Sequence, residues 1–167
     1  IFDIDYTKLY ENGRKIILLD LDNTLIPYDT KTPNEKHVNF FQELKTIGFR
    51  VVIISNNHQP RVHQFASLVG CEYINSALKP LKRGYKKALK LLSFPAKHEI
   101  IAIGDQIMTD VLGSSRVGID CILVKPIKKK SEKWYTKVNR MLEKSILNRI
   151  NKRYPEIYQK IKQLEEE

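Results

Sequence analysis

The sequence predicts an α/β fold, in which a doubly wound, Rossmann-like parallel sheet of about five strands is covered by helices on both faces. Three observations support this fold class. Short apolar segments alternate with amphipathic ones, several of the apolar segments end in a polar residue, and Gly48, Gly70 and Gly118 separate successive units. Units of this size favour an open sheet over a barrel of eight units.

Five segments are predicted as strands. The first is an unbroken apolar run at residues 16–19, and such runs are typical of a strand that is buried on both faces of a parallel sheet. The other four segments cover residues 51–54, 71–74, 100–103 and 121–124.

Amphipathic segments between these strands are predicted as helices. One should begin with Thr32 as its cap, Pro33 as its first residue and Glu35 completing a capping box, and it should end at Gly48. The remaining helices are expected between residues 60 and 70, 85 and 92, and 111 and 117.

Charge divides the 167-residue chain into two regions. Residues 1–124 hold 16 Lys and Arg against 13 Asp and Glu, whereas residues 125–162 hold 13 against 3. We therefore predict a core at 1–124 and a basic helical C-terminal extension at 125–167. The extension contains an apolar stripe from Trp134 to Ile150, and a last short helix is expected at 157–164, after Pro155.

No apolar run approaches the roughly 20 residues of a membrane-spanning helix, and the first ten residues lack the apolar core of a secretory signal. The two cysteines, Cys71 and Cys121, are expected to be free thiols in a reducing compartment. These features predict a cytoplasmic protein, with peripheral attachment to a membrane as a further expectation.

Two acids follow the first predicted strand. Asp20 is the residue directly after the apolar run, and Asp22 lies just beyond it. Such close carboxylates repel each other unless a cation is near, and a hard cation such as Mg²⁺ prefers oxygen ligands. The pair therefore indicates a metal site at the carboxyl end of the sheet, where α/β proteins bind their ligands.

Other polar residues follow the later strands. Ser55 comes after the second, Lys79 after the third and Asp105 after the fourth, with Asp110 five positions further on. These residues supply acids for a metal, a hydroxyl near a helix start and an ammonium group. Together they favour a site that binds a phosphoryl group with Mg²⁺.

These motifs resemble those of the haloacid dehalogenase-like (HAD) phosphohydrolases, in the same order and after the same elements. The resembling segments are Asp20-Leu21-Asp22-Asn23-Thr24-Leu25, Ser55-Asn56-Asn57, Lys79-Pro80 and Gly104-Asp105-Gln106. The residues of these motifs resemble those of the capless bacterial YqeG-type class IIIA phosphatases and of the related phosphatidylglycerophosphate phosphatases.

The resemblance implies a role for each motif residue. Asp20 would be the nucleophile that forms an aspartyl-phosphate, and Asp22 would be the general acid and base. The implied Mg²⁺ ligands are Asp20, the main-chain carbonyl of Asp22, and Asp105. Phosphate would be bound by Ser55, the main-chain N–H of Asn56 and Lys79, with Thr24, Gly104 and Asp110 in support.

Two assignments stay open at this point. Lys82 competes with Lys79 for the role of the site lysine, although the Lys79-Pro80 pair fits the family better. Either Asp105 or Asp110 could be the direct metal ligand.

The spacing of the motifs leaves no room for a cap domain: 32 residues separate Asp22 from Ser55, and 23 separate Ser55 from Lys79. An open site favours a bulky phosphorylated substrate, such as a lipid headgroup or a macromolecule. The basic residues 125–153 predict attraction to an anionic membrane surface or to RNA. The alternative function is a non-catalytic protein that binds RNA, ribosomes or a membrane surface.

Overall fold

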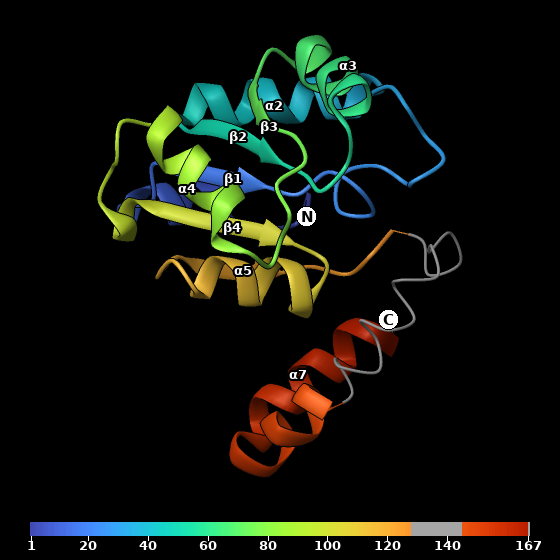
Figure 1. Cartoon of the computed structure of the whole chain (residues 1–167), viewed down its shortest axis with the longest axis vertical. Coiled ribbons are helices and arrows are strands. Elements are labelled where there is room, and N and C mark those ends of the chain that lie inside the picture. The colour runs from blue at the N-terminus through green and yellow to red at the C-terminus, as the bar shows by residue number, and fades with distance from the viewer. Residues whose placement is uncertain (128–144, 167) are drawn as a thin grey trace. The chain divides into compact units, whose positions relative to one another are not determined.

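The computed structural model describes residues 1–127 and 145–166 of the chain. In the first range, five parallel strands form one sheet in the order β3-β2-β1-β4-β5 (Figure 1). They are β1 (Ile16–Leu19), β2 (Arg50–Ile54), β3 (Glu72–Ile74), β4 (Ile100–Gly104) and β5 (Asp120–Leu123). The predicted fold class and all five predicted strands are confirmed, with small shifts at the strand ends.

The central strand is β1, which pairs with β2 on one side and β4 on the other. Ile16 aligns with Arg50 of β2 and with Ile100 of β4. Flanked by two strands and covered on both faces, Ile17 and Leu19 have no exposed surface. The parallel register brings the carboxyl ends of these three strands to one edge of the sheet.

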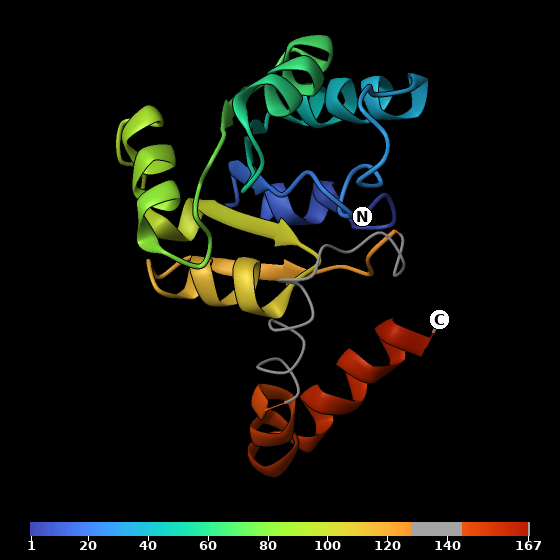
Figure 2. The same cartoon turned by 45° about the vertical axis from the view of Figure 1, so that its right-hand side comes forward.

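Helices cover both faces of the sheet (Figures 1 and 2), and alternate residues of β1 belong to different hydrophobic clusters. Ile17 and Leu19 pack in a hydrophobic cluster with α1 (Tyr6–Glu11), α2 (Glu35–Ile47) and α3 (Gln59–Val69). Leu18 packs in a second cluster, on the opposite face, with α4 (Lys82–Leu91) and with residues that follow α5 (Leu112–Ser115). The sheet is therefore doubly wound, as predicted.

No domain is inserted between β1 and β3 in this fully described part of the chain. Residues 20–49 contribute one loop and α2, and residues 55–71 contribute α3 and short connections. The carboxyl edge of the sheet thus lacks a cap domain in these positions, as the spacing of the motifs predicts.

The predicted start of α2 at Thr32 and Pro33 is wrong. The cap is Asn34, whose Oδ1 accepts the main-chain N–H of His37 at 3.2 Å, and Glu35 is the first helical residue. Asn is a better cap than Thr, and its side chain satisfies one of the free N–H groups of the first turn. The predicted ends at Gly48 and Gly70 are confirmed, both with left-handed backbone (φ 112° and 66°).

Other helical segments also differ from the prediction, and α4 begins at Lys82, three residues before the expected start at residue 85. Helix α1 was not predicted. It begins after Asp5, whose carboxylate accepts the N–H of Lys8 at 2.9 Å. The helical segment expected at 111–117 begins earlier, because the π-helical turn η2 (Ile107–Val111) leads into α5, and it ends earlier, at Ser115. A short 3₁₀ turn, η1 (Lys97–Glu99), precedes β4.

The chain divides into two compact units, Ile1–Ile127 and Lys128–Glu167. In the second unit, residues 145–153 are helical, and α7 (Pro155–Glu166) begins with proline in the first turn, where its missing N–H costs nothing. This helix is longer than the predicted 157–164. The predicted stripe between Trp134 and Leu142 lies outside the described residues.

Among the residues that the structure describes, no helix combines the length and the apolar character needed to cross a bilayer. Cys71 and Cys121 are free and partly buried, as predicted.

Candidate active site

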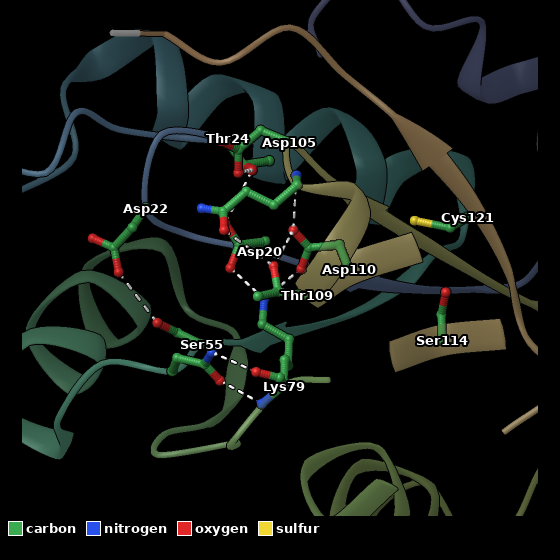
Figure 3. Close-up of polar contacts among 12 residues, drawn as sticks. Asp20, Asp22, Thr24, Ser55, Lys79, Asp105, Thr109, Asp110, Ser114 and Cys121 are labelled. Atoms are coloured by element: carbon green, nitrogen blue, oxygen red, sulfur yellow. Dashed lines mark hydrogen bonds and ion pairs between the residues drawn. The ribbon is translucent and has the colours of Figure 1, made fainter. Parts of the chain in front are cut away.

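The carboxyl ends of three neighbouring strands bring the predicted site residues together (Figure 3). Asp20 follows β1, Ser55 follows β2 and Asp105 follows β4, while Lys79 lies in the loop between β3 and α4. Asp20, Ser55 and Lys79 are buried, and Asp105 is partly exposed. The geometric expectation that separate strand ends meet is therefore correct.

The ammonium group of Lys79 lies between two buried carboxylates. Its Nζ is 2.5 Å from Asp20 Oδ1 and 2.6 Å from Asp110 Oδ1. Burial acts to lower the pKa of Lys79, but the charges of Asp110 and Asp20 outweigh burial and raise this pKa well above its ordinary value. Lys79 therefore provides a permanent positive charge beside Asp20. Lys82, the other candidate, is exposed on α4.

Asp20 and Asp105 lie where their charged forms are disfavoured. Burial raises the pKa of Asp20 to about 7, although Lys79 acts in the opposite direction. Burial, reinforced by the charge of Asp20, raises the pKa of Asp105 to about 8. Thr24 Oγ1 lies 3.0 Å from Asp20 Oδ2 and 3.0 Å from Asp105 Oδ1. Because a hydroxyl has one hydrogen, Thr24 donates a hydrogen bond to only one of these oxygens at a time.

Three acids can share a cation at this point. Asp20, Asp105 and Asp110 each offer one carboxylate oxygen, and these oxygens all lie within 4.8 Å of one another. Such a set of hard oxygen donors fits a divalent cation, which would offset the cost of burying several like charges. The side chain of Asp22 is not in this group; its predicted metal contact was through the main-chain carbonyl.

The carboxylate of Asp110 is held by several donors. Its Oδ1 accepts from Lys79, and its Oδ2 accepts the N–H of Gln106 at 3.1 Å and the hydroxyl of Thr109 at 3.2 Å. A Cβ atom on Gly104 would lie only 2.6 Å from Asp110 Oδ2. Gly104 thus leaves the space in which Asp110 reaches Lys79, which gives a physical reason for a glycine before Asp105.

Asp22 belongs to a second network, beside the first (Figure 3). Its Oδ2 accepts from Ser55 Oγ at 3.3 Å and from Asn57 Nδ2 at 3.2 Å. Its Oδ1 lies 2.8 Å from Arg61 Nε and 2.7 Å from Arg61 Nη2. Arg61 was not predicted as a site residue, because one arginine on an amphipathic helix resembles any surface residue. Asn57 was predicted only as part of the Ser-Asn-Asn motif.

The side chain of Asn56 supports the loop that carries Lys79. Its Nδ2 donates to the carbonyl of Lys79 at 3.0 Å, and its Oδ1 accepts the N–H of Lys79 at 2.6 Å. Ser55 Oγ in turn accepts the N–H of Asn57 at 3.0 Å. The Ser-Asn-Asn segment therefore links Asp22 to the site lysine, and Asn56 fixes the loop through its side chain.

Comparison with known sequences identifies the family of this chain. Residues 1–118 match the family described as haloacid dehalogenase-like hydrolase. A protein of Bacillus subtilis (strain 168), named as the probable phosphatase YqeG, is 37% identical over 153 residues, which are 92% of this chain and 88% of that protein.

Solved structures share the fold at lower identity. An uncharacterised protein from Listeria monocytogenes serotype 4b superposes with a TM-score of 0.54 at 18% identity, over 71% of this chain and 85% of its own. A hypothetical protein from Xanthomonas campestris gives 0.53 at 15% identity, over 81% of this chain and 75% of its own. With the family match over residues 1–118 and the YqeG relative, we conclude that this chain belongs to the haloacid dehalogenase-like hydrolases.

Proposed function

We propose that this hydrolase is a Mg²⁺-dependent phosphomonoesterase that works through an aspartyl-phosphate on Asp20. The main support is the contact of 2.5 Å between Asp20 and Lys79, in a buried site where Asp105 and Asp110 offer further oxygens. The 37% identical relative named as a probable phosphatase supports the same activity.

The proposed chemistry has two steps. In the first, a carboxylate oxygen of Asp20 bonds to phosphorus while the bond between phosphorus and the alcohol oxygen breaks; the leaving oxygen keeps the electron pair and takes a proton from Asp22. In the second, water attacks phosphorus and gives a proton to Asp22, and the bond to Asp20 breaks. Inorganic phosphate is released, and both acids return to their starting state.

The surrounding residues would hold the phosphoryl group. We assign Ser55 Oγ and the main-chain N–H of Asn56 to the phosphate oxygens, because both lie directly after β2 at the carboxyl edge of the sheet. Lys79 would balance negative charge on phosphate and on Asp20, and its buried position makes that charge effective.

Mg²⁺ would be held by Asp20, Asp105 and the main-chain carbonyl of Asp22, where it neutralises charge on the phosphoryl oxygens. We favour Asp105 over Asp110 as the direct ligand. Both oxygens of Asp110 already accept from Lys79, Gln106 or Thr109, which suits a residue that orients Lys79 and supports the metal from outside its ligand shell.

The test is hydrolysis of p-nitrophenyl phosphate by the wild type and by Asp20→Asn, which keeps size but removes the nucleophilic charge. We expect Mg²⁺-dependent release of nitrophenol by the wild type, and no release above background by the variant. Circular dichroism and the melting temperature serve as controls for folding. Mg²⁺-supported activity that survives this change would exclude Asp20 as the nucleophile.

The substrate we propose is a phosphate on a bulky or accessible carrier, such as a lipid headgroup of the phosphatidylglycerophosphate type, or a macromolecule. The absence of an inserted domain between β1 and β3 supports an open site. Phosphate release from phosphatidylglycerophosphate, nucleotides and phosphosugars, compared at equal concentration, would test this; a strong preference for small phosphosugars would contradict it.

The second candidate function is binding of an anionic membrane surface or RNA through residues 125–153. The observation that favours it is the basic excess of this segment, in which Lys125, Arg149, Lys152 and Arg153 are exposed. Binding to anionic liposomes and to RNA across a salt series should weaken in a full-length variant with these four residues changed to Gln. Unchanged binding would exclude these four side chains as contributors, and unchanged binding after residues 125–153 are deleted from a still-folded protein would contradict the second candidate function. A cytoplasmic location remains part of the proposal.

A further inference from the structure

The guanidinium group of Arg61 connects three segments of the chain. It contacts Asp22 Oδ1 through Nε and Nη2, at 2.8 and 2.7 Å. Its Nη1 donates to the carbonyl of Thr30 at 2.7 Å, and its Nη2 also donates to the carbonyl of Pro27 at 3.2 Å. Arg61 lies in the first turn of α3, so it ties this helix to Asp22 and to the segment Pro27–Thr30.

Both partners of the ion pair are largely removed from water. The side chains of Arg61 and Asp22 are 14% and 13% exposed. The Tyr28 ring lies beside the guanidinium, with 5.4 Å between its centroid and Cζ. A partly buried arginine is costly unless its donors are paired, and here three of its nitrogens have carboxylate or carbonyl acceptors.

The two carboxylate oxygens of Asp22 accept hydrogen bonds from different residues. Oδ2 accepts from Ser55 and Asn57, whereas Oδ1 accepts from Arg61. Donors on both oxygens define the plane and the rotation of the carboxylate, and the Arg61 side of this arrangement depends on α3 and on the segment Pro27–Thr30.

We propose that Arg61 is a positioning residue. It holds Oδ1 of Asp22 and the segment Pro27–Thr30 in one arrangement. Ser55 releases Oδ2 when its hydroxyl turns to the phosphate, and Oδ2 is the oxygen that carries the proton given to the leaving oxygen. This inference rests on the proposed function, in which Asp22 is the general acid. Arg61 acts through Asp22, and it makes no contact with phosphorus in this scheme.

The planar fork of arginine suits the contacts at this position. One guanidinium reaches a carboxylate and two carbonyls in different directions, whereas the ammonium group of lysine is a single point of charge on a flexible stem. We therefore expect Arg61→Lys to restore part of what Arg61→Ala removes, and Arg61→Gln to restore less.

The test compares two substrates that differ in their need for an acid. p-Nitrophenol is a good leaving group and departs without much help, whereas the alcohol of glycerol phosphate needs a proton as the bond breaks. For the full-length Arg61→Ala variant with Mg²⁺, we expect kcat on glycerol phosphate to fall by about 10- to 100-fold. The fall on p-nitrophenyl phosphate should be clearly smaller, and KM should change less than kcat for both.

A double-mutant cycle shows whether Arg61 works through Asp22. In an Asp22→Asn background, Arg61→Ala should cause little further loss of kcat, because the group that Arg61 positions has already lost its function. Additive losses would place the effect of Arg61 elsewhere and would overturn the proposal.

Arg50→Ala is the matched control. Arg50 and Glu72 pair at 2.7 Å, and they are the first residues of β2 and β3, at the opposite ends of these strands from the site residues. The loss of Arg50 should therefore leave kcat unchanged on both substrates. Equal losses on both substrates for Arg61→Ala, or no loss at all, would overturn the positioning role. Failure of the proposed function is a separate result, since it would appear as wild-type hydrolysis that does not depend on Asp20.

Discussion

At the scale of single residues, Lys79 is the cation of a buried cluster of charges, because its ammonium group pairs with the carboxylates of both Asp20 and Asp110. Both ion pairs are buried, and their nitrogen–oxygen distances are 2.5 and 2.6 Å. Removing one member of a buried ionic cluster leaves uncompensated charge in a low-dielectric environment. We therefore expect the loss of Lys79 to affect folding as well as the proposed chemistry.

We predict that Lys79→Met lowers the free energy of unfolding by about 3–5 kcal/mol at pH 7.5 without Mg²⁺. The loss should be smaller at pH 5, because the pKa of Asp20 is raised by burial and Asp20 takes up a proton at that pH when Lys79 is absent. Urea denaturation at the two pH values measures both effects. Lys82→Met, on the exposed face of α4, is the control and should change stability by less than about 0.5 kcal/mol. Equal effects of the two substitutions would contradict the central position of Lys79.

The buried acids also predict how metal binding depends on pH. The pKa of Asp20 is about 7 and that of Asp105 about 8 in the folded chain without metal, against about 4 for an aspartate in an unfolded chain. The folded state therefore holds protons that the unfolded state has already lost. The stability that these protons provide is complete below about pH 4, and it is lost as the pH rises through about 7 to 8.

A cation takes the place of these protons, since carboxylates bind metals in their deprotonated form. We expect Mg²⁺ to raise the melting temperature more at pH 8.5 than at pH 6, relative to EDTA. Differential scanning calorimetry at both pH values measures the shift. Asp105→Asn should abolish most of it. A shift of the same size at pH 6 and pH 8.5 would show that the metal does not compete with protons at these acids.

At the scale of elements, the start of α2 shows how side-chain capping selects the first residue of a helix. Thr32, Pro33 and Glu35 match a helix-start pattern, yet the structure uses Asn34 with His37. His37 is buried, and its Nε2 lies 2.8 Å from the carbonyl of Leu25. The cap therefore also ties α2 to the loop after Asp22, a connection that no local pattern reports.

This difference can be tested by substitution. Asn34→Ala should lower the free energy of unfolding by about 1 kcal/mol, because one N–H of the first turn loses its acceptor. Thr32→Ala should have an effect within about 0.5 kcal/mol, since Thr32 is exposed and precedes the helix. Chemical denaturation of both variants provides the comparison. A larger loss for Thr32→Ala would restore the helix start expected from the sequence.

At the scale of the whole molecule, the unit Ile1–Ile127 contains both hydrophobic clusters and every residue of the proposed site. Its last residues contact the site loop, because the N–H of Ile127 donates to the carbonyl of Asn23 at 2.9 Å. Asn23 is buried and has a left-handed backbone (φ 65°), which asparagine tolerates better than most residues.

We predict that a chain shortened to residues 1–127 unfolds cooperatively and keeps the wild-type kcat on p-nitrophenyl phosphate. A chain shortened to 1–124, the boundary expected from charge, should be less stable, because it lacks the bond from Ile127 to Asn23. Thermal unfolding and activity assays distinguish the two. Loss of activity in the 1–127 chain with its fold intact would show that the second unit contributes to the site.

The sequence by itself determined the strands, their direction and the kinds of residue at their ends. An apolar run indicates a buried strand from the local sequence alone. Because the carboxyl ends of parallel strands lie at one edge of the sheet, the sequence was enough to predict that Asp20, Ser55, Lys79 and Asp105 lie close together. Most of the helix ends at glycine residues could likewise be predicted from the local sequence.

Only the tertiary structure decided which partners these residues have. Arg61 is 39 positions from Asp22, and Lys79 is 31 positions from Asp110, so both pairs depend on how helices and loops pack against the sheet. The same packing left Lys82 exposed. Hydrophobic periodicity specifies which face of an element is buried, but the rotamers and distances of polar groups at the site depend on contacts between segments far apart in the chain.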